Sequence, residues 1–289
     1  MKRFGEPITD GLRTVYEAEL LHSERTPYQK LEIYDHPSFG RVLTLDDLIQ
    51  TTERDEFCYH EMLVHPALAS LERVERVLIV GGGDGGTLRR VLEHGPEEAV
   101  MCEIDDAVVR ACREHMPAIA AGALDDPRTR VVIGDGAAFV AEHESSFDAV
   151  IVDGSDPVGP ATVLFAESFF DACRRALRPG GVFVTQSGSP MFQTDEFRRV
   201  YANATAVFPT AEVYLSFVPT YPGVLWSYTT GSTGEPVSAA SPEVVRRRLE
   251  SRGVDARFYT PDLHPSVFVL PGFVEEICAS AVTTSVPHG

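Results

Sequence analysis

The feature that most restricts the fold of this chain is the glycine-rich run GGGDGG at positions 81–86. It directly follows the short apolar segment VLIV (77–80) and precedes TLRRVLEH, in which Leu88, Val91 and Leu92 share one helical face. Glycine lets the backbone turn sharply and approach a ligand without an intervening side chain. A strand, a glycine-rich turn and a helix in this order fit a nucleotide-binding sheet.

Strands and helices alternate from this unit onward. Further strands are expected at 99–104, 130–136, 147–153, 178–189, 211–218 and 225–232, the last two as a closing pair. Apolar strands that alternate with helices are buried on both faces, which implies an α/β fold with a doubly wound parallel sheet. Ligands of such sheets bind beyond the carboxyl ends of the strands, where several of the motifs below fall.

The first 56 residues differ in character from the rest of the 289-residue chain. The segments YQKLEIYDH (28–36) and RVLTLDDLIQTT (41–52) are rich in β-branched and aromatic residues and are separated by turn residues. They predict a small antiparallel β unit. Because the chain is long for one compact core, we expect an N-terminal β domain at 1–56 and a Rossmann-like domain at 57–289.

Charge and composition exclude several classes of protein. The chain has 43 acidic and 25 basic residues and a net charge of −18. Such a field disfavours nucleic acid and attracts cationic ligands, although it also serves solubility. No stretch approaches the roughly 18 to 20 apolar residues of a membrane span, and no apolar segment marks a signal peptide. We therefore expect a cytoplasmic protein with no membrane partner.

Five cysteines are scattered along the chain without a C-x-x-C pair: Cys58, Cys102, Cys112, Cys173 and Cys278. An odd and dispersed set argues against both a disulfide framework and a zinc site. We expect most of them to be small buried apolar residues.

Acidic residues at the ends of the next two strands indicate what the loop binds. Glu103 lies 22 residues after Gly81, the placement at which a carboxylate accepts hydrogen bonds from ribose hydroxyls. Asp135, which precedes Gly136, can accept from an adenine amino group. Asp84 would repel a pyrophosphate, but it would stabilise a nucleoside sulfonium with an ammonium tail. It would also oppose the carboxylate of S-adenosylmethionine, which the decarboxylated form lacks.

A second pair of carboxylates follows the fourth strand in the turn DGSDPVGP (153–160). Asp153 and Asp156 project there from an otherwise apolar strand, in a turn stiffened by two prolines. Asp-Gly and Asp-Pro are common turn formers, so a purely structural role is the alternative. Two carboxylates at the edge of the sheet where ligands bind favour a functional role.

These motifs together resemble a known family. GGGDGG, CEID, IGDG and VDGSDPVGPA, with LDDLIQTTERDEFCYHEM upstream and PTYPG downstream, are closely similar to the spermidine synthases, the polyamine aminopropyltransferases. The resemblance runs from about Tyr28 to Thr230 and continues more loosely through RFYTPDLHPSVFVLP. It implies a seven-stranded, methyltransferase-like catalytic domain and a homodimer or homotetramer.

The resemblance also implies a role for each matching residue. Decarboxylated S-adenosylmethionine, a co-substrate rather than a cofactor, would be held by Gln50, Gly81, Asp84, Glu103, Asp135 and Gly136. A diamine or polyamine acceptor would lie against Tyr59, His60, Asp84, Asp153, Asp156, Gln186 and Tyr221. Asp153 would be the catalytic base, helped by the Tyr59 hydroxyl. No metal is needed, because the positive charge of the sulfonium already activates the leaving sulfur.

The implied reaction is transfer of the aminopropyl group to putrescine, giving spermidine and methylthioadenosine. The chain departs from the family pattern at Asp47, Gly154, Gly188 and Val224. Since most of these positions lie near the acceptor side, cadaverine, agmatine or spermidine remain possible acceptors. Two further functions stay open at this point: an S-adenosylmethionine-dependent methyltransferase and a non-catalytic polyamine-binding protein. Trp226, the single tryptophan, is expected to serve packing.

Overall fold

The computed structural model describes residues 1–154 and 159–283. Its N-terminal part is a five-stranded antiparallel sheet with the strands in sequence order. The strands are β1 (Lys2–Thr9), β2 (Leu12–Arg25), β3 (Lys30–His36), β4 (Gly40–Leu45) and β5 (Leu48–Thr52). The first helix begins at Glu56, so the chain leaves this sheet shortly after Thr52.

The larger part of the chain forms a seven-stranded sheet of order β11-β12-β10-β9-β6-β7-β8. Its strands are β6 (Arg76–Gly81), β7 (Glu98–Glu103), β8 (Thr129–Ile133), β9 (Phe147–Asp153), β10 (Leu177–Gly188), β11 (Thr210–Phe217) and β12 (Leu225–Ser232). The strands from β8 to β10 are parallel, whereas β12 is antiparallel to both of its neighbours. The predicted doubly wound α/β fold with a small β unit is confirmed.

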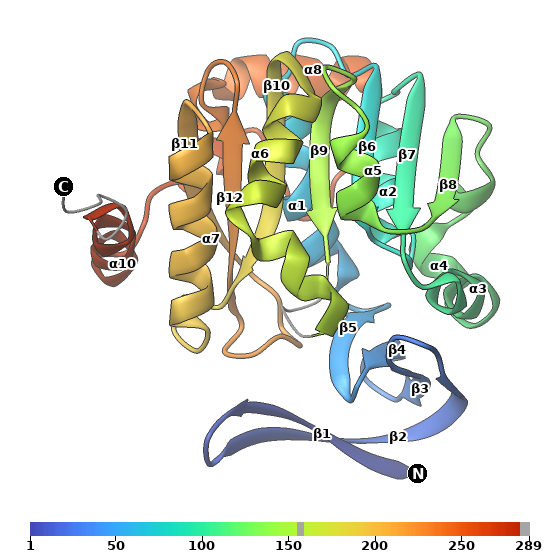
Figure 1. The fold of residues 1–289 in the computed structure, drawn as a ribbon. Helices are drawn as coiled ribbons and strands as arrows, with labels where there is room; N and C mark the ends of the chain where they lie inside the picture. Colours follow the sequence, from blue (N-terminus) through green and yellow to red (C-terminus); the bar gives the residue numbers. More distant parts are fainter. Residues whose placement is uncertain (155–158, 284–289) are drawn as a thin grey trace.

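Helices cover both faces of the large sheet, α1 and α2 on one and α5, α6 and α7 on the other, and further helices lie at its edges (Figure 1). The helices are α1 (Glu56–Ser70), α2 (Gly86–Glu93), α3 (Asp106–His115), α4 (Pro117–Ala120), α5 (Gly136–Ala141), α6 (Glu167–Ala176), α7 (Thr194–Val207), α8 (Pro242–Arg252), α9 (Leu263–Ser266) and α10 (Gly272–Thr283). Short 3₁₀ helices lie at η1 (Ala123–Asp125), η2 (Gly159–Phe165) and η3 (Val237–Ala239). None of the helices in the described ranges has both the length and the apolar character needed to cross a membrane.

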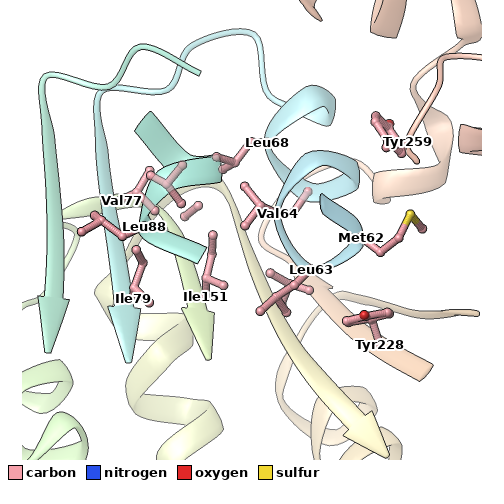
Figure 2. Close-up of a cluster of buried hydrophobic side chains, with 14 of the residues drawn as sticks. Met62, Leu63, Val64, Leu68, Val77, Ile79, Leu88, Ile151, Tyr228 and Tyr259 are labelled. Carbon is pink, nitrogen blue, oxygen red and sulfur yellow. The ribbon is translucent and has the colours of Figure 1, made fainter. Parts of the chain in front are cut away.

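Alternate residues of the central strands belong to two separate cores. Val77 and Ile79 of β6 pack with α1 and α2 in one core, which Figure 2 shows in part. Leu78 and Val80 of the same strand pack with α5, α6 and α7 in the other. Because both faces are covered, the strands are apolar throughout, and polar side chains are concentrated at their ends.

The N-terminal sheet lies below the carboxyl ends of β6, β7 and β9 (Figure 1). Leu31 and Ile33 of β3 pack against Val108 and Cys112 of α3, and all of these side chains are buried. Asp105 adds polar contacts, since its Oδ2 accepts from the Thr26 hydroxyl at 2.8 Å and from the Gln29 amide at 2.9 Å. All five cysteines are buried and free.

Two departures from the family pattern fall in turns with positive φ. Asp46 and Asp47 have φ of 48° and 68° in the two-residue turn between β4 and β5. This geometry favours glycine or aspartate, so Asp47 preserves the turn. Val224, in the turn before β12, has φ of 66°. A β-branched side chain in this region is a strained exception.

We predict that Val224→Gly stabilises the protein. Relief of the backbone strain outweighs the extra entropy of glycine in the unfolded chain, for a net gain of about 1 kcal/mol in the free energy of unfolding. Urea denaturation of both proteins measures this change. The control is Val163→Gly: Val163 has the same 45 % exposure but lies in the 3₁₀ helix η2, so its replacement lowers stability. A loss of stability in Val224→Gly would contradict the prediction.

Candidate active site

A cavity of about 230 Å³ lies between the carboxyl ends of the parallel strands and the N-terminal sheet. It is lined by all predicted site residues within the described ranges: Gln50, Tyr59, His60, Gly81, Asp84, Glu103, Asp135, Gly136, Asp153, Gln186 and Tyr221. Asp156, the remaining one, lies outside the described residues. The structure thus brings together side chains that are up to 171 positions apart in the sequence, while their individual roles stay predictions.

The glycine-rich loop is shaped by its contact with the end of β9. The Gly82 N–H donates to the Asp153 carbonyl oxygen at 2.9 Å. Gly81 has φ of 85°, and a Cβ on it would lie 2.2 Å from the same oxygen. Only glycine fits such a position. Asp84 follows in the loop with 9 % of its surface exposed, and its Oδ1 accepts from the Gly86 N–H at 2.7 Å.

Glu103 and Asp135 form the end of the cavity that lies beyond β7 and β8. Glu103 is buried, and its Oε1 accepts from the Asp105 N–H at 2.9 Å. Burial raises the pKa of Glu103 to about 7. Asp135 caps the N-terminus of α5 by accepting from the Ala137 N–H at 2.8 Å. Both carboxyl groups are placed to accept hydrogen bonds from a polar ligand such as a nucleoside.

Tyr59 and Asp153 form a hydrogen-bonded pair near the centre of the cavity. The Tyr59 hydroxyl, from α1, donates to Asp153 Oδ1 at 2.8 Å. Burial and the nearby Asp84 carboxylate raise the pKa of Asp153 above its ordinary value. A carboxylate with a raised pKa accepts a proton more readily at neutral pH, so this pair has the chemistry of a general base.

His60 lies beside this pair between two carboxylates. Its Nδ1 is 2.9 Å from Glu56 Oε2, and its Nε2 is 3.6 Å from Asp84 Oδ2. Burial by itself lowers the pKa of His60, but the Asp84 and Glu56 carboxylates outweigh it and raise the pKa to about 10. His60, Asp84 and Asp153 also place ligand atoms within 4.8 Å of one another. Two of these three groups are carboxylates, which attract a cationic ligand.

Aromatic and amide side chains also line the cavity. The Tyr221 hydroxyl donates to the Gln50 carbonyl oxygen. The Tyr221 ring lies 4.6 Å from that of Trp226 in an edge arrangement and 5.5 Å from that of Tyr59. Trp226 is 3 % exposed and packs in the core as expected, and it also lines the cavity. Gln186 donates to the Gly154 carbonyl oxygen at 3.4 Å.

Gly188 has a structural reason to be glycine in this chain. Its φ is 75°, and a Cβ would lie 2.7 Å from Gln193 Oε1. The Gly188 N–H donates to Gln186 Oε1 at 2.9 Å. The glutamate that the family pattern places at 188 therefore does not fit here unless Gln193 moves.

The sequence reasoning missed several polar residues of the cavity, Glu6, Tyr28, Gln29 and Asp46. Glu6, on β1, is 5 % exposed and lines the cavity. A signal for it exists, because Glu6 lies two residues after Phe4, on the buried face of the strand. Gln29 lines the cavity while its amide donates to Asp105. No local pattern indicates Gln29, since its position depends on how the two sheets meet.

Comparisons with known proteins agree with this geometry. The spermine/spermidine synthase domain matches residues 56–241, and the spermidine synthase tetramerisation domain matches residues 4–53. The polyamine aminopropyltransferase of Thermoanaerobacter sp. is 46 % identical over 95 % of this chain and 97 % of that one. Polyamine aminopropyltransferase 1 of Pseudomonas aeruginosa is 45 % identical over 95 % and 96 %.

Solved structures show the same likeness. A crystal structure of spermidine synthase with the transition state analogue AdoDATO matches with a TM-score of 0.92 and 37 % identity, covering 96 % of this chain and 95 % of that one. The spermidine synthase of Thermotoga maritima matches with a TM-score of 0.89, at 36 % identity over 96 % and 94 %. Fold and site thus define an enzyme that transfers an aminopropyl group. The chain belongs to the spermine/spermidine synthase family, and the resemblance seen in the sequence is confirmed.

We predict that Tyr59→Phe shifts the pH dependence of the reaction. The substitution removes the hydrogen bond that stabilises the ionised Asp153, so the pKa of Asp153 rises further. If this carboxylate is the base, the acid limb of the kcat/KM profile, recorded from about pH 6 to about pH 9, moves to higher pH.

Tyr228→Phe is the matched control for this prediction. The Tyr228 hydroxyl donates to the backbone carbonyl oxygen of Tyr59 at 3.2 Å and not to Asp153. We therefore expect Tyr228→Phe to leave the acid limb of the kcat/KM profile where it is in the wild-type enzyme. An unmoved limb in Tyr59→Phe would show that a group other than Asp153 controls the profile.

Proposed function

We propose that this enzyme transfers the aminopropyl group of decarboxylated S-adenosylmethionine to putrescine, producing spermidine and methylthioadenosine. The observation that carries the proposal is the Tyr59–Asp153 pair at 2.8 Å, which lies in one cavity with Asp84 of the glycine-rich loop. A proton acceptor for an amine and an anionic site for a cationic donor are thus placed side by side. No cofactor or metal has a part in the proposed reaction.

The donor is assigned from the charges around the loop. Glu103 takes the ribose hydroxyls, and Asp135 with Gly136 takes the adenine, with Gln50 and Gly81 completing the lining. Asp84 faces the ammonium end of the donor. The carboxylate of intact S-adenosylmethionine would meet Asp84 with the same sign of charge. This repulsion favours the decarboxylated form and disfavours a methyltransferase.

The proposed mechanism begins with removal of a proton from the acceptor. An alkylammonium has a pKa of about 10 and is no nucleophile until it is deprotonated. Asp153, hydrogen-bonded to Tyr59, takes the proton. The free amine then attacks the propyl carbon next to the sulfonium, and the carbon–sulfur bond breaks with its electron pair remaining on sulfur. Orientation of the two bound reactants supplies much of the acceleration.

A diamine acceptor is supported by a further buried carboxylate of the cavity. Glu6 lines the same cavity, at 5 % exposure, but comes from the N-terminal sheet. In the proposed complex one amine of putrescine meets Asp153 while the other, still charged, faces Glu6. Gln186, Tyr221 and His60 line the same cavity. Cadaverine, agmatine and spermidine are the competing acceptors.

We further propose a homodimer or homotetramer that works in the cytoplasm. The match of residues 4–53 to a tetramerisation domain supports self-association. Four apolar residues of β2 are also exposed, Leu12, Val15, Leu20 and Leu21. A second copy of the chain is the partner that these observations favour.

A product assay tests the proposed function. We expect the protein, given decarboxylated S-adenosylmethionine and putrescine, to form methylthioadenosine and spermidine, both detected by mass spectrometry. Cadaverine, agmatine and spermidine are tested in parallel as acceptors. Faster turnover with one of these would overturn the putrescine assignment. Methyl transfer from intact S-adenosylmethionine, with no methylthioadenosine formed, would overturn the donor assignment.

Asp153→Asn is the control for this assay. The amide keeps the shape of the side chain but accepts no proton, so the turnover falls by roughly 10² to 10⁴ while the donor still binds. Unchanged turnover in this variant would remove Asp153 from the mechanism.

We predict that Glu6→Gln weakens binding of diamines selectively. Loss of a charge-assisted hydrogen bond costs about 1.5 to 3 kcal/mol, which raises the KM for putrescine about 10-fold to 100-fold. The KM for a monoamine such as butylamine, which has no second ammonium, stays the same. Steady-state kinetics with both amines measure the difference. Glu17→Gln, at an exposed position on β2, is the matched control, and an equal rise with both amines would contradict the assignment.

A further inference from the structure

A line of buried charged groups extends from the cavity into the protein. Asp84 Oδ2 lies 3.6 Å from His60 Nε2, and His60 Nδ1 lies 2.9 Å from Glu56 Oε2. The other oxygen of Glu56 accepts from Arg90 Nη2 at 3.0 Å. Arg90 also donates to Glu93 at 2.9 Å. Only Asp84, at the start of this line, belongs to the loop that meets the donor.

Both ring nitrogens of His60 face carboxylates. An imidazole donates from both nitrogens only when it is protonated. Exposure is 1 % for the His60 side chain, 8 % for Glu56 and 3 % for Arg90, so water screens these charges little. The raised pKa of His60 agrees with this geometry: the two carboxylates outweigh the effect of burial. Free enzyme therefore holds a cation directly against Asp84.

The groups that face His60 come from several elements. Glu56 lies on α1, Asp84 on the loop after β6, and Asp153 at the end of β9, while Arg90 and Arg89 of α2 lie behind Glu56. The ring packs so closely on the start of α2 that a Cβ on Gly86 would lie 2.2 Å from His60 Cε1. The His60 ring therefore has little room to move, so a change at this residue is a change of its protonation state rather than of its position.

We propose that Glu56, held by Arg90, is a positioning residue that keeps His60 as a cation against Asp84 in the free enzyme, and that the ammonium of the bound donor displaces one proton from His60 to water. The inference rests on the proposed function, in which the donor ammonium faces Asp84. Two cations beside one carboxylate repel each other. In the proposed complex the ammonium of the donor contacts Asp84 more closely than His60 does, and it keeps its proton. The imidazole, which then shares Asp84 with the ammonium, is the weaker base and loses its proton.

This exchange has a consequence for binding. In the free enzyme the His60 proton balances the charge of Asp84, which a buried site would otherwise leave uncompensated. Since binding of the donor releases a proton, its affinity increases as the pH rises. Methylthioadenosine has neither ammonium nor sulfonium, so its affinity does not change in this way. The enzyme thereby distinguishes the donor from the product by charge as well as by shape.

Isothermal titration calorimetry tests the proposal. Titration of decarboxylated S-adenosylmethionine into the enzyme at about pH 8, in phosphate and in Tris, gives the number of protons released from the difference in observed heat. We expect about one proton for the wild-type enzyme with this donor and about none with methylthioadenosine. Glu56→Gln removes one of the two carboxylates that keep His60 charged, so its release with the donor falls toward zero.

Glu93→Gln is the matched control variant. Glu93 contacts the same arginine, but it does not contact His60 among the described residues, so proton release stays at the wild-type value. Equal release in wild type and Glu56→Gln would overturn the proposal, as would a wild-type enzyme that binds the donor and releases no proton. A donor that does not bind at all contradicts the proposed function instead.

A second measurement avoids dependence on the fold of the Glu56→Gln variant. Nitrogen NMR of wild-type enzyme labelled at histidine reports the protonation state of each imidazole. We expect His60, assigned with a His60→Gln variant, to give imidazolium shifts in the free enzyme and neutral shifts in the donor complex. A His60 signal that is neutral in both states, or charged in both, would overturn the proposal.

Discussion

The contact between the glycine-rich loop and the end of β9 determines where the charged groups of the site lie. The Gly82 N–H reaches the Asp153 carbonyl oxygen, and Gly81 leaves no space there for a side chain. Since β6 and β9 are neighbours in the sheet, this contact places Asp84 close to the Asp153 carboxylate. The Asp84 carboxylate raises the energy of the ionised state of Asp153. The site is therefore built to be completed by cations.

Helix α1 supplies groups that lie beside the two carboxylates and offset their mutual repulsion. Tyr59 and His60 of this helix line the cavity. Glu61 accepts hydrogen bonds from the backbone N–H groups of residues 257–259 and so holds that C-terminal segment against α1. Arg90 lies 3.0 Å from Glu56 and 3.7 Å from Glu61. Removing one member of a buried ionic group typically costs about 3 to 5 kcal/mol, whereas apolar replacement of the whole group is often neutral or stabilising. The cluster is better explained by its position behind Asp84 than by stability.

The sequence was most informative where function restricts the local backbone. The loop at 81–86 and the acidic residues after β7, β8 and β9 indicated the fold and the cavity, because parallel strands bring their carboxyl ends to one edge. Glu6 and Gln29 were not identified, since they reach the cavity only through packing of the N-terminal sheet on α3. Gly188 looked like a lost carboxylate, and only the structure shows that Gln193 occupies the space beside it.

The proposed reaction places two opposite demands on one cleft. It must hold amines as cations, yet one of them must give up its proton before it can attack. Burial and Asp84 raise the pKa of Asp153 and bring it closer to that of the amine, which lowers the cost of the proton transfer. A carboxylate that takes this proton no longer attracts the molecule it has deprotonated. In the proposed complex the charge that holds the acceptor comes from Glu6, which lines the cavity from the other sheet. The proposed reaction therefore draws these two functions from the two sheets between which the cavity lies.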